Sequence, residues 1–112
     1  MTLKEVVEKL GLSALTQELA NDTEISGAYT CDLLSDVMAN GKPGNLWITM
    51  QTHQNILAVV RLKDLAGIIV VNGRQPDGDT IEKAADEKVS ILGTGESAFS
   101  ISGRLYRLLE ES

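Results

Sequence analysis

The stretch WITMQTHQNI, residues 47–56, holds the only tryptophan and the only histidine of a 112-residue chain. His53 follows Thr52 and precedes an apolar run, which predicts that it lies in the first turn of a helix. A histidine there can contact an anionic ligand, act as a general acid or base, or simply begin the helix as a neutral imidazole. Thr52 is suited both to contacting a ligand and to capping that helix. These two residues therefore mark a candidate site.

A second polar group, Asn72, Gly73 and Arg74, follows the apolar run GIIVV. An asparagine or glycine at positive φ could shape an anion cradle, and Arg74 carries the forked donor group that suits carboxylates and phosphates. An ordinary turn explains the Asn-Gly pair equally well. Thr94 lies in GTGES, which lacks the glycine spacing and the lysine of a nucleotide-binding loop. The predicted ligand-binding residues are Thr52, His53, Asn72, Gly73, Arg74 and Thr94.

Catalysis is the alternative that these residue types raise. Cys31 beside Asp32 could be a nucleophile and its base, and His53 could be the base of a phosphoryl- or acyl-transfer enzyme with Asp32 as its partner. No nucleophile signature surrounds Cys31, and a lone cysteine is most often a small buried hydrophobe. Asp32 is expected to cap a helix. With one histidine and one cysteine the chain has no metal-ligand spacing, so we expect no metal, no cofactor and no catalytic residues.

The elements that position these residues alternate along the chain. Apolar spacing predicts helices over residues 3–10, 32–39, 53–63, from 79 through at least 85, and 98–109. Short apolar or β-branched runs predict strands over 13–17, 24–30, 45–50, 67–71 and 89–92. Strands separated by helices indicate βαβ repeats, hence an α/β fold with a mostly parallel sheet flanked by helices. Right-handed crossovers then bring every strand-to-helix loop to the carboxyl edge of the sheet, where ligands bind in such folds.

Composition bounds the remaining possibilities. A length of 112 residues with 43% hydrophobic side chains supports a single domain over 1–112. A formal charge of −6 and the lack of a basic cluster disfavour nucleic acid and anionic membranes as partners. No apolar run reaches the length of a membrane span, no basic leader is visible, and one cysteine excludes an internal disulfide. We expect a cytoplasmic protein.

Residues from TMQTHQNI to SGRL, preceded by GAYTCDLLSDVM, resemble the DRTGG domain, which occurs alone and attached to CBS pairs. They are also similar to the N-terminal domain of HPr kinase/phosphorylase. Pro76, Thr94 and Phe99 match the family pattern, whereas residues 51–53 replace its Gly-Asp-Arg run and residues 71–73 replace its Thr-Gly-Gly run. The resemblance implies an α/β regulatory or interaction domain without an established activity.

The helix HQNILAVVRLK is apolar on nearly every side, so a sheet on one side would leave a second apolar face. We predict a homodimer through this helix, with Leu57 or Val59 at the interface; alternatively, a terminal helix covers that face. The leading hypothesis is a non-catalytic DRTGG-like module that senses a small anionic metabolite, or passes a regulatory signal to a partner enzyme. A transfer enzyme that uses His53, and a purely structural dimerisation domain, are the alternatives.

Overall fold

The structure, a computed structural model, describes all 112 residues. Its helices are α1 (Leu3–Leu10), α2 (Leu34–Asn40), α3 (Asn55–Lys63), α4 (Gly78–Glu87) and α5 (Ala98–Glu110). Its strands are β1 (Ser13–Ala14), β2 (Gly27–Thr30), β3 (Asn45–Thr49), β4 (Gly67–Val70) and β5 (Ile91–Gly93). Each predicted helix and strand is present, with ends displaced by a few residues. No helix is both long and apolar enough to span a bilayer.

The five strands form one sheet in the order β1-β5-β4-β3-β2. Neighbouring strands from β2 to β5 are parallel, and only the two-residue β1 is antiparallel, with Ser13 opposite Gly93. The expected α/β fold with a mostly parallel sheet is therefore confirmed. Because β2, β3, β4 and β5 are adjacent and parallel, their carboxyl ends lie side by side at one edge of the sheet.

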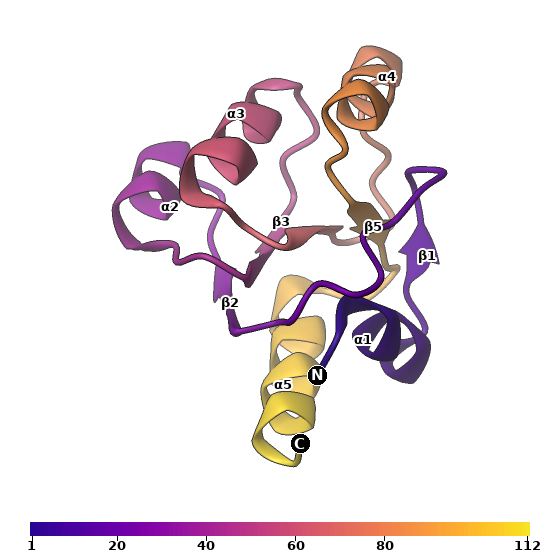
Figure 1. The fold of residues 1–112 in the computed structure, drawn as a ribbon, viewed down its shortest axis with the longest axis vertical. Coiled ribbons are helices and arrows are strands. Elements are labelled where there is room, and N and C mark those ends of the chain that lie inside the picture. The colour runs from indigo at the N-terminus through magenta and orange to yellow at the C-terminus, as the bar shows by residue number, and fades with distance from the viewer.

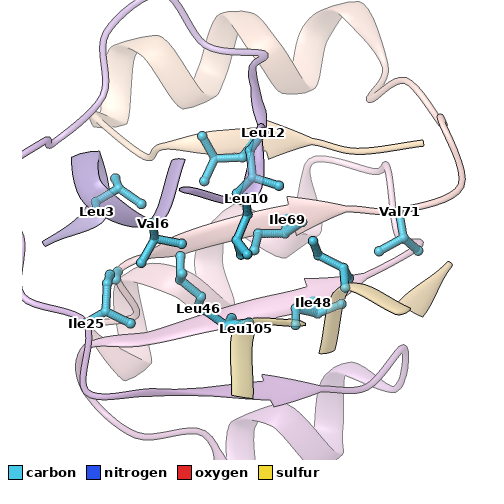
Figure 2. Close-up of a cluster of buried hydrophobic side chains, with 13 residues drawn as sticks. Leu3, Val6, Leu10, Leu12, Ile25, Leu46, Ile48, Ile69, Val71 and Leu105 are labelled. Carbon is cyan, nitrogen blue, oxygen red and sulfur yellow. The ribbon is translucent and has the colours of Figure 1, made fainter. Parts of the chain in front are cut away.

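Two apolar layers are separated by the sheet. α1 and α5 cover one face, and α2, α3 and α4 cover the other (Figure 1). Alternation along β3 fills both layers, because Leu46 and Ile48 face the first and Trp47 faces the second. Figure 2 shows how side chains of α1, the strands and α5 meet in the first layer. Burial on both faces explains why the strands read as continuous apolar runs.

In the first 30 residues, the ends of α1 are as predicted, but the start of β2 is displaced. Thr2 and Glu5 form the predicted capping box of α1, and Gly11 ends the helix in the left-handed conformation. β2, however, begins at Gly27 rather than at residue 24. Glu24 forms an isolated bridge with Thr2 instead, and the N–H of Ile25 donates to the carbonyl of Met1 at 2.9 Å. Glu24 and Ile25 thus pair with the N-terminus instead of beginning β2.

The prediction that Leu57 or Val59 forms a dimer interface is wrong, because both side chains belong to the core. Leu57 is 0% exposed and Val59 is 5% exposed. α3 lies between α2 and α4 on its face of the sheet and contacts both. Its apolar surface is therefore covered on three sides, by the sheet and by two neighbouring helices rather than by a terminal helix. Leu62, at 72% exposure, is the large apolar residue of α3 that points outward.

Candidate functional site

All six predicted ligand-binding residues lie at the carboxyl edge of the sheet. Thr52 and His53 follow β3, residues 72–74 follow β4, and Thr94 follows β5. Because these strands are adjacent and parallel, the three loops are neighbours along one edge. The topological expectation that brought these residues together is therefore met.

The loops after β4 and β5 are bonded directly to each other. Asn72 and Gly73 have φ values of 60° and 66°, in the left-handed region that the Asn-Gly pair favours. The N–H of Asn72 donates to the carbonyl of Glu96, and that of Gly73 donates to the carbonyl of Thr94, both at 2.9 Å. The N–H of Arg74 donates to Val71. The loop therefore has no free N–H groups at these positions, so a backbone anion cradle is not formed and any contact must use side chains.

His53 shapes the loop after β3. Its Nδ1 accepts a hydrogen bond from the N–H of Asn55 at 3.0 Å, so His53, rather than the Thr52 side chain, satisfies a free donor at the start of α3. An Nδ1 that accepts requires the proton of a neutral ring to lie on Nε2. The imidazole is exposed, and Nε2 has no partner within the protein. His53 is thus held in a fixed tautomer with its donor available.

The remaining threonines tie the loops together. The carbonyl of Thr52 accepts from the N–H of Asp77 at 3.2 Å and from the hydroxyl of Thr80 at 2.9 Å, which links the β3 loop to the start of α4. The hydroxyl of Thr94 accepts from the N–H of Glu96 at 3.1 Å. The proton of the Thr94 hydroxyl remains available to an outside acceptor.

Asp32 does not cap α2, which begins at Leu34 without a side-chain cap. Its Oδ1 instead accepts from the hydroxyl of Thr49 and from the N–H of Met50, both at 2.8 Å. The side-chain amide of Gln51 donates to the carbonyl of Asp32 at 2.8 Å. These bonds join the ends of β2 and β3. No hydrogen bond connects Asp32 with His53, so the pair that a transfer enzyme would need is not formed.

The structure contains a polar cluster between β2 and α2 that the sequence analysis did not predict. The hydroxyl of Tyr29 donates to Oδ2 of Asp36 at 2.9 Å, and the thiol of Cys31 donates to the same oxygen at 3.2 Å. The amide of Asn40 donates to Oδ1 at 2.6 Å. Tyr29 and Cys31 are two residues apart in extended chain, so their side chains point to the same side, and Asp36 follows in the next helix. This spacing is the only sequence signal for the cluster. Cys31 is thus paired with Asp36 rather than with Asp32.

These contacts shift three pKa values. Hydrogen bonds from Cys31, Tyr29 and Asn40 lower the pKa of Asp36. The bond to Asp36 is the main reason why the pKa of Tyr29 is raised. For Cys31, the N–H of Leu33 lowers the pKa, but burial and the Asp36 carboxylate outweigh it and raise the pKa overall. A thiol with a raised pKa is a poor nucleophile near neutral pH.

Charge at the edge is of both signs. Glu96 pairs with Arg104 and accepts from the hydroxyl of Ser100 at 2.7 Å, so its charge is compensated. Arg74 is exposed and has no carboxylate partner within the protein. Asp77 and Asp79 lie nearby at the start of α4. An anion would therefore meet a single uncompensated guanidinium, at the loop after β4.

The six predicted ligand-binding residues line none of the four main hollows of the molecule. The largest hollow, about 680 Å³, lies elsewhere, between β2 and α5. Of the matched family positions, only Phe99 lines it. No group of three or more His, Cys, Asp or Glu side chains is close enough to hold a metal ion.

No family model matches this sequence, and no curated protein matches it. Among solved structures, the chain is similar to the CBS and DRTGG domains of the regulatory region of Clostridium perfringens pyrophosphatase, a complex with its activator diadenosine tetraphosphate. The TM-score is 0.66 at 18% sequence identity, and the match covers 93% of this chain and 45% of that chain. The chain therefore spans less than half of the protein that it matches. The fold expected from the sequence resemblance is confirmed: this chain has the fold of a DRTGG-like domain.

Proposed function

We propose that this chain is a non-catalytic regulatory module whose carboxyl edge senses a small anionic metabolite and passes the signal to a second copy or to a partner enzyme. Thr52, His53, Asn72, Gly73, Arg74 and Thr94 form the sensing surface. The similar solved region is a regulatory one and carries a bound nucleotide activator, which supports this role. The observation that carries the choice of ligand is the uncompensated guanidinium of Arg74 beside the carboxyl ends of parallel strands.

Recognition in this proposal is made by side chains. The backbone N–H groups of residues 72–74 already donate to backbone carbonyls, so they add only a rigid frame. Arg74 supplies the charge, and Nε2 of His53 supplies a donor whose tautomer is fixed by Asn55. Because the six residues line none of the four main hollows, a ligand with several anionic oxygens is favoured over one that needs an enclosing pocket.

A non-catalytic role is supported by the pairings of the candidate catalytic groups. Asp32 is committed to Thr49 and Met50, and the thiol of Cys31 is bonded to Asp36, whose carboxylate raises the pKa of that thiol. Neither arrangement offers His53 a partner that would activate it as a base.

The test is a thermal-unfolding screen with inorganic phosphate, pyrophosphate, citrate, ATP and diadenosine tetraphosphate. A ligand present at a hundred times its dissociation constant stabilises the folded state by about 2.7 kcal/mol, which is an upward shift of roughly 10 °C for a domain of this size. Arg74→Ala and His53→Ala should abolish the shift. Lys42→Ala, which removes an exposed cation at the amino edge, is the matched control and should leave the shift intact.

Each of the other outcomes has a definite meaning. If no probe shifts the unfolding temperature, the sensing role is rejected and a structural dimerisation module remains. Turnover of a probe that disappears in His53→Ala would instead establish the enzyme. A shift that survives both edge variants would move the binding surface away from Arg74.

A further inference from the structure

An exposed aromatic pair lies on the outer face of α5, beside the open edge of the sheet. Phe99 is 91% exposed and Tyr106 is 69% exposed. They are seven residues apart, or about two turns, so they share one side of the helix. The chain has one Phe, two Tyr and one Trp, and two of these four aromatic side chains are on this face. On the inner face of α5, Ile101 and Leu105 pack into the core and are both 0% exposed. The aromatic pair therefore lies outside the core.

The largest hollow of the molecule adjoins this pair. Its volume is about 680 Å³, and it lies between β2 and α5, with Phe99 and Tyr106 on its wall. The rest of the lining combines small residues, such as Ala28 and Gly103, with the larger Ile48, Leu109 and Glu110. A Cβ added at Gly103 would meet nothing within 4 Å. A protrusion and a hollow thus stand side by side on one face.

The edge of β2 is also open. The N–H of Cys31 donates to the carbonyl of Ile48 on β3. Because backbone groups alternate in direction along a strand, those of Ala28 and Thr30 point away from β3. No strand pairs with this side of β2, and both residues are exposed. Unpaired strand edges are the part of a sheet most prone to association.

We propose that this face, the outer side of α5 and the edge of β2, is the interface with a second copy of this chain. A two-fold axis needs a surface that complements itself, and a protrusion beside a hollow meets that condition, since each Phe99 can enter the hollow of the other copy. The interface does not depend on the sensing surface, because it involves none of those six residues.

The aromatic pair supplies more than half of the area that a stable dimer needs. Burying four aromatic side chains, two from each copy, removes on the order of 600 Å² from water. A specific interface begins at about 1,000 Å² in total. In the proposed dimer, the remainder has to come from the walls of the two hollows and from the two β2 edges. Because each copy carries a charge of −6, the copies repel each other at long range, so added salt should strengthen the dimer rather than weaken it.

Light scattering coupled to size exclusion tests this interface. The wild type should give twice 12.1 kDa at micromolar concentration. Phe99→Glu and Tyr106→Glu should each weaken the dimer by about a hundredfold or more, since a buried unpaired carboxylate is strongly unfavourable. Phe99 lies in the first turn of α5, where a carboxylate suits the helix dipole, so Phe99→Glu should remain folded by circular dichroism. Leu62→Glu on α3 makes the same change at another exposed site and should remain a dimer.

Gly103→Ala provides a second test that does not depend on introducing charge. Alanine favours the helix of the monomer, but its methyl group would stand in the hollow that receives Phe99. We expect higher thermal stability of the monomer together with at least a tenfold weaker dimer. A wild type that is monomeric at all concentrations overturns the proposal. So does a dimer that survives both Glu variants or is lost in Leu62→Glu.

Discussion

Asp32 is expected to stabilise the carboxyl edge by joining two strand ends, and Asp32→Ala measures that role. The substitution removes the acceptor of the Thr49 hydroxyl and of the Met50 N–H. Met50 is exposed, so water can replace the lost acceptor there. Thr49 is only 1% exposed, so its hydroxyl loses a charged partner without a ready replacement.

A hydrogen bond to a charged group contributes about 1.5–3 kcal/mol, and the exposure of Asp32 places this one near the lower end. We therefore expect Asp32→Ala to reduce the free energy of unfolding by about 2 kcal/mol, and Asp32→Asn, which keeps an oxygen acceptor, by about 1 kcal/mol. In thermal unfolding the alanine variant should melt roughly 8 °C lower.

Urea unfolding, fitted to a two-state transition with an unchanged slope, is the assay. Asp77→Ala is the matched control, because Asp77 also precedes a helix at the same edge but makes no side-chain cap bond. It should change stability by no more than about 0.5 kcal/mol. A double-mutant cycle with Thr49→Val should give a coupling of about 1 kcal/mol. Equal losses for Asp32→Ala and Asp77→Ala, or a coupling near zero, would refute the bridging role.

Three further predictions concern the Asp36 cluster and two glycines. Asp36→Asn should speed alkylation of Cys31 by iodoacetamide near pH 8 several-fold, because the carboxylate raises the pKa of the thiol, whereas Ser35→Ala should not. Since the pKa of Asp36 is lowered by folding, its contribution to stability is complete above the ordinary aspartate pKa and is lost as the pH falls through the lowered value; the stability difference between wild type and Asp36→Asn should therefore vanish in acid urea titrations. Gly67→Ala should cost roughly 3 kcal/mol in urea unfolding, because its Cβ would lie 2.9 Å from the carbonyl of Ser90, while Gly73→Ala, with φ of 66° but no neighbour within 4 Å, should cost about 1 kcal/mol.

The arrangement of the strands and helices was accessible from the sequence because apolar runs such as GIIVV indicate strands buried on both faces. The rule that parallel strands share a carboxyl edge then placed Thr52, Arg74 and Thr94 on one surface. What covers α3 could not be predicted from the sequence, because an apolar helix can be covered either by a partner chain or by flanking helices. Which of these covers Leu57 depends on where α2 and α4 lie, which is a property of the whole fold.

Hydrogen-bond partners far apart in sequence explain the other errors. Local propensity assigns Asp32 to a helix cap, but its carboxylate finds Thr49, which is 17 residues away. The Asn-Gly pair correctly indicated positive φ, yet the sequence did not reveal that the N–H groups would donate to the loop after β5. The same limit applies to the outer face of α5, since Phe99 is an ordinary apolar residue of a helix until the sheet shows which side is free.

The two proposed surfaces are connected through the start of α5. The carbonyl of Glu96 accepts from the N–H of Asn72 at 2.9 Å, and its carboxylate binds Ser100 and Arg104 on α5. Phe99 lies within this same turn, so these bonds offer a path by which a ligand that moved the loop after β4 would reach the helix that carries the aromatic pair. Binding linkage is reciprocal: if a ligand at Arg74 tightens the dimer by some factor, dimerisation tightens the ligand by the same factor. Ligand affinity measured in wild type and in Phe99→Glu would therefore give the coupling directly, and equal affinities would mean that the two surfaces act independently.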